Sequence, residues 1–145
     1  MENKLKIGLL VPFSGKYKEL GNSFLFSMQL ALEEIGDDNI LIIPRDSGSD
    51  DKEQLNKAIR EIAAEDIKIV IGPINFNEIE EVTKYSNMIF ISPSNINPRI
   101  KKNVISIGIS LESQLLSLKK FLKEQKKIKT VILFPDNGYT KIIKE

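Results

Sequence analysis

Short apolar runs alternate with amphipathic segments along this chain, and each apolar run ends in small or polar residues. Apolar runs bounded by turn residues are typical of buried strands, whereas apolar positions three and four residues apart are typical of helices. The predicted strands cover residues 4–12, 40–44, 68–71, 88–91 and 130–134, with a short edge strand over 104–109. The predicted helices cover residues 22–35, 50–64, 77–85 and 110–122. This alternation predicts an α/β fold, an open parallel sheet with helices on both faces.

Polar residues and glycine mark the expected helix ends. Asn22 or Ser23 is expected to cap the first helix, and Gly36 is expected to end it in the left-handed conformation. Asp50 followed by Glu53 has the spacing of a capping box, with aspartate as the cap of the second helix.

Composition excludes several kinds of chemistry. The chain has 145 residues, enough for an ordinary domain with a core, and a formal net charge of +1 from 21 basic and 20 acidic residues. This balance gives no electrostatic reason to expect nucleic acid or an anionic membrane as a partner. It contains neither cysteine nor histidine, which excludes thiol catalysis, disulfides, histidine acid–base chemistry and most zinc sites.

The loops after the strands lack the motifs of nucleotide-binding and phosphate-accepting proteins. A dinucleotide site needs G-x-G-x-x-G after the first strand, where this chain has Pro12-Phe13-Ser14-Gly15, and no P-loop motif is present. A receiver domain needs acidic residues after the first and third strands, where Pro12 and Gly72-Pro73 stand. No cofactor is therefore predicted.

Catalysis and metal binding have weak support in the sequence. Serine hydrolysis usually needs a histidine base, and no spacing singles out a Ser–Lys pair. Asp46, Asp50 and Asp51 could ligate a metal, but acids between a strand and a helix more often cap the helix or form turns. A small flavodoxin-like enzyme stays an alternative, and it would need a titratable group with a perturbed pKa, which no residue in the sequence marks.

Neutral hydrogen-bonding residues follow most of the predicted strands. In a parallel α/β sheet the loops after the carboxyl ends of the strands, here called the carboxyl edge, form the usual ligand site. Hydroxyl and amide groups there can bind a small polar ligand without reacting with it. Helix capping is the alternative role for Asn77, and turn formation is the alternative for residues 92–95. The candidates from these loops are Ser14, Asn75, Asn77, Ser92, Ser94 and Asn95.

The order of these segments resembles the amino-terminal half of a type I periplasmic binding protein. The resemblance is to the leucine/isoleucine/valine-binding protein family, the solute receptors of branched-chain amino-acid ABC transporters, and it covers nearly the whole chain. The matching segments are residues 7–15 (Ile-Gly-Leu-Leu-Val-Pro-Phe-Ser-Gly) with Gly21, Asp46, residues 71–73 (Ile-Gly-Pro), residues 91–95 (Ile-Ser-Pro-Ser-Asn) with Pro98, and Asp136 with Gly138-Tyr139.

The resemblance implies a flavodoxin-like or Rossmann-like lobe, one of two lobes that close on a ligand. It implies that residues 1–109 form the amino-terminal lobe and that residues 110–145, opening with a helix capped by Ser110, begin the second lobe, which the chain leaves truncated. It also implies a small polar solute such as an amino acid as ligand, and the membrane subunits of an ABC transporter as partners.

Carried over residue by residue, the resemblance adds Phe76 and Tyr139 to the candidate ligand-binding residues. Phe76 stands where the amino-acid receptors use a serine to hold the ligand carboxylate. In the next loop, Ser94 and Asn95 offer backbone groups, but Ile96 falls where the receptors have a threonine.

A second branch of the superfamily is also similar. The penicillin-binding-protein activators of the outer-membrane lipoprotein type share an opening like residues 12–17, an Asp-Ser/Thr-Gly like residues 46–48 and a segment like residues 107–112. This resemblance implies an interaction protein that contacts a cell-wall synthase rather than a solute.

Both resemblances imply a periplasmic or cell-envelope location. The opening Met1-Glu2-Asn3-Lys4 lacks the apolar segment of a signal peptide, so we expect that an export signal has been removed. No apolar run approaches the ~18 residues of a membrane helix. An exposed apolar surface near residues 131–134 would favour self-association of a truncated chain.

Overall fold

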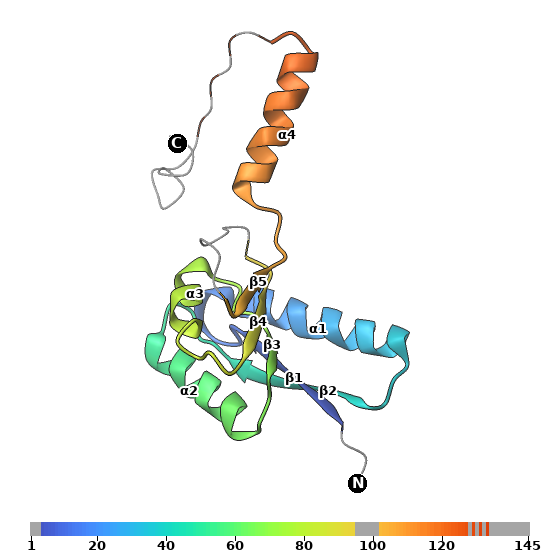
Figure 1. The fold of residues 1–145 in the computed structure, drawn as a ribbon, viewed down its shortest axis with the longest axis vertical. Coiled ribbons are helices and arrows are strands. Elements are labelled where there is room, and N and C mark those ends of the chain that lie inside the picture. The colour runs from blue at the N-terminus through green and yellow to red at the C-terminus, as the bar shows by residue number, and fades with distance from the viewer. Residues whose placement is uncertain (1–3, 95–101, 128, 130, 132, 134–145) are drawn as a thin grey trace. The chain divides into compact units, whose positions relative to one another are not determined.

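The computed structural model describes residues 4–94, 102–127, 129, 131 and 133 (Figure 1). The chain divides into two compact units, residues 1–108 and residues 109–145. The predictions for Asn95 and Tyr139, and most of the strand predicted over 130–134, lie outside the described residues. Whether the second unit begins a second lobe stays a prediction.

The first unit contains a five-stranded parallel sheet, which confirms the predicted fold class. Its strands are β1 (Leu5–Val11), β2 (Ile40–Asp46), β3 (Ile69–Ile71), β4 (Ile89–Ser92) and β5 (Val104–Ser106). The strand order is β2-β1-β3-β4-β5, and every neighbouring pair is parallel. Since all strands run the same way, the loops that follow them gather at the carboxyl edge.

Helices flank the sheet on both faces. They are the short 3-10 helix η1 (Gly15–Tyr17), α1 (Lys18–Ile35), α2 (Lys52–Ala64) and α3 (Phe76–Val82). In Figure 1, α2 and α3 lie on one side of the sheet and α1 lies on the other. Because each parallel connection needs a crossover, the segments that follow β1, β2 and β3 pass over one face of the sheet or the other.

The core lies between the sheet and the pair α2 and α3. Leu10, Val70 and Phe90, from three neighbouring strands, are fully buried against Ile59 and Ile62 of α2. These two isoleucines stand three residues apart on one helix face, as the apolar periodicity predicts. The α2–α3 side therefore supplies most of the apolar burial that stabilises this unit.

The opposite face of the sheet is less covered. Side chains alternate between the two faces of a strand, so Ile89 points away from the face that carries Phe90. Ile89 is 48% exposed and Ile105, on the edge strand, is 52% exposed. On α1, Phe26 is 62% exposed, and Gly21 is the one buried residue of that helix.

Two predicted helix starts were wrong by a few residues. The first helix begins at Lys18, and Ser23 lies inside it, where its hydroxyl donates to the carbonyl of Glu19 at 2.9 Å. The second helix is capped by Asp51 rather than Asp50, because Asp50 has a φ of 64° and forms the turn before the cap. Gly36 ends α1 in the left-handed conformation, as predicted.

The cap of α2 gives a stability prediction. Oδ1 of Asp51 accepts hydrogen bonds from the backbone N–H groups of Glu53 at 2.9 Å and Gln54 at 3.1 Å. Asp51→Ala leaves both donors without this acceptor, so we expect a loss of about 1 kcal/mol in the free energy of unfolding. Urea denaturation followed by circular dichroism measures it. Asp38→Ala, the same charge change at an exposed turn, is the control, and an equal loss in both variants would contradict the capping role.

The second unit is described by its helix α4 (Leu111–Glu124). Ser110 caps it, as predicted, by accepting a hydrogen bond from the N–H of Ser113 at 3.1 Å. Val131 and Leu133 are exposed, and the self-association that they would favour stays a prediction. Among the helices that the structure describes, none has the length and apolar character to cross a bilayer.

Candidate functional site

Three of the predicted ligand-binding loops begin at neighbouring points of the carboxyl edge. They follow β1, β3 and β4, and β3 lies between the other two strands in the sheet. The fold therefore brings together residues that are up to 80 positions apart, from Ser14 to Ser94. Within this edge, however, their side chains have different surroundings.

The loop after β1 is fixed by the loop after β2. Oδ1 of Asp46 accepts hydrogen bonds from the N–H groups of Phe13 at 2.7 Å and Gly48 at 2.9 Å. Burial would raise the pKa of Asp46, but hydrogen bonds from Gly48, Ser14 and Phe13 together lower it. The carbonyl of Ser14 accepts a further bond from the hydroxyl of Ser49 at 2.8 Å. Asp46 thus acts as a loop anchor, while the side chain of Ser14 is exposed.

The loop after β4 is held to the loop after β3 by one hydroxyl group. Oγ of Ser92 donates to the carbonyl of Pro73 at 2.7 Å and accepts from the N–H of Ser94 at 3.2 Å. Both serines are buried. The hydroxyl of Ser92 therefore serves a structural role inside the loop.

The loop after β3 leads directly into α3. Asn75 is the N-cap residue, but its side chain donates to Oε1 of Glu78 at 3.2 Å instead of accepting from the helix. Asn77, which we considered as a helix cap, is the second residue of the helix, so that alternative was wrong. Phe76 is 39% exposed and Asn77 is exposed, so both side chains can reach a ligand at this edge.

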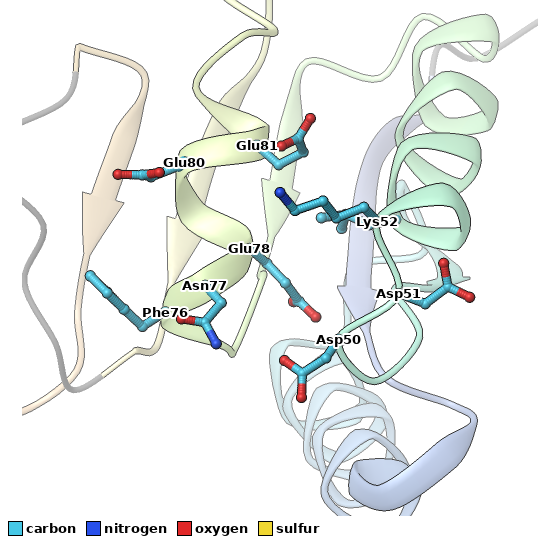
Figure 2. Close-up of a pocket in the computed structure, with 9 residues that line it drawn as sticks. Asp50, Asp51, Lys52, Phe76, Asn77, Glu78, Glu80 and Glu81 are labelled. Atoms are coloured by element: carbon cyan, nitrogen blue, oxygen red, sulfur yellow. The ribbon is translucent and has the colours of Figure 1, made fainter. Parts of the chain in front are cut away.

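A pocket of about 480 Å³ lies between the start of α2 and α3. This acidic pocket is lined by Asp50, Asp51, Lys52, Leu55, Phe76, Asn77, Glu78, Glu80 and Glu81. Figure 2 shows α3 on one side and the loop that leads into α2 on the other. Phe76 and Asn77 are the two predicted site residues in its lining, and five of its residues are acidic.

Glu78 is the functional candidate that the sequence interpretation missed. It is 4% exposed, and among the described residues its Oε2 atom has no hydrogen-bond partner. Burial raises the pKa of Glu78 to about 7, the hydrogen bond from Asn75 lowers it, and the negative charges of Asp50 and Asp46 raise it further. The sequence interpretation had singled out no residue for such a shift.

A signal for Glu78 exists in the sequence. Ile79 and Val82 form the buried stripe of α3, and Glu78 lies four residues before Val82 on the same face. A charged residue on an apolar helix face is a candidate for a perturbed pKa.

The acids considered as metal ligands do not assemble. Asp46 accepts bonds from two loops and Asp51 caps α2, so their carboxylates already have partners. In the ranges that the structure describes, no group of three or more acidic side chains is arranged to hold a metal ion.

Comparison with known proteins identifies the fold. The family model described as periplasmic binding protein matches residues 4–140. No curated protein matches the chain by sequence.

Several solved structures are similar over long segments. Haemophilus influenzae LpoA matches 97% of this chain at a TM-score of 0.73 and 20% identity, and the match covers 26% of LpoA. The leucine-binding protein LivK of Thermotoga maritima matches 84% at a TM-score of 0.69 and 20% identity, over 37% of its length. A Rhodopseudomonas palustris ABC-transporter solute-binding protein, solved with p-hydroxybenzoic acid, matches 84% at a TM-score of 0.71 and 15% identity, over 36% of its length. The chain thus spans about a quarter to two fifths of these proteins.

Proposed function

This chain belongs to the periplasmic binding protein family, and from that premise we propose that its first unit is a ligand-binding lobe of a solute receptor. The receptor would serve an ABC transporter in the periplasm or cell envelope. Its ligand would be an amino acid or another small polar solute, held without catalysis.

One observation carries this proposal. Loops that follow two neighbouring strands, β1 and β3, present exposed residues at one edge of the sheet: Ser14, whose hydroxyl also bonds to Asp46, and then Phe76 and Asn77. Such loops, placed at the carboxyl ends of parallel strands, are where α/β folds bind ligands. An amide and a hydroxyl can hold a polar head group, and the ring can pack on an apolar side chain.

A second candidate function rests on the loop after β4. The receptors that the sequence resembles bind the ligand with polar groups of this loop. Here Ser92 and Ser94 are buried, and the hydroxyl of Ser92 forms hydrogen bonds with Pro73 and Ser94. This favours an interaction protein like the penicillin-binding-protein activators, which would contact a cell-wall synthase. The similarity to LpoA over 97% of the chain supports this alternative.

A thermal-shift screen of the common amino acids and small aromatic carboxylates separates the two functions. A ligand that binds only the folded state raises its stability, so one ligand class should raise the melting temperature by several degrees if the chain is a receptor lobe. Stabilisation by no compound would contradict solute binding. It would direct the next experiment to a pull-down with cell-wall synthases.

The position of Phe76 gives a more specific prediction. Phe76→Ser places a hydroxyl at the edge where the amino-acid receptors bind the ligand carboxylate. A hydrogen bond to a charged group contributes ~1.5–3 kcal/mol, so carboxylate affinity should rise by about tenfold or more. Isothermal titration with leucine measures this change. Phe26→Ser, which changes another exposed phenylalanine on α1, is the control. Equal affinities in both variants would count against the receptor proposal.

A further inference from the structure

The acidic pocket combines excess negative charge with a buried carboxylate oxygen, Oε2 of Glu78, that has no hydrogen-bond partner among the described residues. Five of its lining residues are acidic and one, Lys52, is basic. An acidic cluster on a surface is ordinarily solvated, so charge alone gives no reason to expect a ligand. Glu78 is different, because it is 4% exposed and its Oε2 atom accepts no hydrogen bond from the described residues.

Buried carboxylate oxygens are rarely left without a donor, because burial without a hydrogen bond costs free energy. Figure 2 shows the carboxylate of Glu78 extending from α3 toward that of Asp50, which comes from the loop before α2. The structure shows no hydrogen bond or ion pair of the Asp50 carboxylate with the residues it describes. Two acceptors from different elements thus face one space and lack a donor.

The other acidic groups of the pocket are less available. Asp51 caps α2, and Glu81 is paired with Lys84 and accepts a hydrogen bond from Asn56. Glu80 lies on the exposed side of α3, and Figure 2 shows its carboxylate directed away from those of Glu78 and Asp50. The free acceptors that face one space are therefore those of Glu78 and Asp50.

We propose that the acidic pocket binds an organic cation, an ammonium or guanidinium group that donates hydrogen bonds to Glu78 and Asp50. The described residues offer no cluster suited to a metal ion, whereas an organic cation needs only acceptors placed around it. A volume of about 480 Å³ is within the range of small-molecule sites, so it can admit the side chain of lysine or arginine or a small free amine. Leu55, the aliphatic residue of the lining, can contact the apolar stem of such a group.

The acidic pocket shares Phe76 and Asn77 with the proposed solute site but would hold its ligand through other groups. Its charge-bearing groups, Glu78 and Asp50, are not among the groups that would hold the solute at the carboxyl edge. The negative charge around Glu78 and Asp50 favours a cationic group at that end of the pocket.

Proton release gives the site a pH signature. The charged groups around Glu78 are Asp46 at the end of β2, Asp50 in the loop that follows, Asp51 and Lys52 at the start of α2, and Glu80 and Glu81 of α3. The pKa of Glu78 is raised to about 7, so it must lose its proton to bind a cation in neutral solution. The affinity for a cation should then rise about tenfold from about pH 6 to about pH 8.

Isothermal titration of the full chain with agmatine, which carries both an ammonium and a guanidinium group, tests the proposal. We expect binding at about pH 8 that weakens at least tenfold in Glu78→Gln, which keeps the shape and removes the charge. Asp50→Asn should also weaken binding, because it removes the second negative charge. Asparagine is chosen because it tolerates the left-handed backbone of this position. Glu33→Gln, the same charge change on α1, should bind like the unmodified chain.

A second probe identifies the source of the cation. The blocked tripeptide acetyl-Gly-Lys-Gly-amide presents one lysine side chain on a peptide backbone. Binding of this peptide comparable to that of agmatine would support a basic side chain of a protein partner, whereas binding of agmatine alone would support a free amine. Absence of binding by both probes, equal affinity in Glu78→Gln, or an affinity independent of pH would each overturn the proposal. None of these results would alter the solute screen, so the two proposals fail separately.

Discussion

Replacing Gly72 with alanine should lower the free energy of unfolding by more than about 4 kcal/mol, a large share of a typical domain's stability. Gly72 follows β3 directly, and a Cβ atom at this position would lie 2.0 Å from the carbonyl oxygen of Leu10 in β1. Its φ of 110° is also unfavourable for residues with a side chain. Because the obstructing atom belongs to a central strand, relief requires β1 and β3 to separate at the carboxyl edge.

Gly36→Ala is the matched control for this variant. Gly36 also has a positive φ, of 64°, but a Cβ atom there would meet nothing within 4 Å. The backbone strain alone should cost about 1 kcal/mol. Chemical denaturation of both variants measures the difference. If Gly72→Ala lost no more stability than Gly36→Ala, the close approach of β1 and β3 would be contradicted.

Replacing Glu78 with glutamine should raise the free energy of unfolding at about pH 8 by roughly 3 kcal/mol. Burial raises the pKa of this carboxyl from 4.5 to about 7 in the folded chain. An acid with a raised pKa is protonated in the folded state over a range where it is ionised in the unfolded state. Its contribution to stability therefore falls as the pH rises from about 4.5 to about 7, and the full loss remains above that range.

Glutamine cannot ionise, so the variant should lack this loss. The melting temperatures of the two proteins should converge at about pH 4, where Glu78 is protonated in both states, and should differ most above about pH 7. Glu80→Gln, on the exposed side of the same helix, should change the stability little at either pH. If the stability of Glu78→Gln had the same pH dependence as that of the unmodified chain, the raised pKa of Glu78 would be contradicted.

The order of the elements was predictable from the sequence because apolar periodicity reports burial directly. The runs that include Leu10, Val70 and Phe90 form neighbouring strands, and their side chains meet in one core. Cap positions were less predictable. Asp50 and Asp51 are adjacent acids, and only the left-handed backbone at Asp50 decides which of them caps α2.

The candidate site was predictable only as a set of loops. Parallel topology places Ser14, Asn77 and Ser92 at one edge, but their exposure depends on contacts that no local pattern encodes. Ser92 is buried and bonds to a carbonyl 19 positions earlier in the chain, a contact that the local sequence does not reveal. Glu78 was missed because its raised pKa comes first from burial and then from the charges of Asp50 and Asp46, and all of these depend on the tertiary fold.

The hydroxyl of Ser92 has a consequence for the thermodynamics of recognition. By joining the carbonyl of Pro73 to the N–H of Ser94, it ties the first residues of two adjacent loops into one surface when the chain folds. The conformational entropy of these few residues is therefore lost before any partner arrives, and association need not order them again. A solute or a protein that docks on this surface would meet a preorganised template, and its specificity would come from shape rather than from loop adaptation.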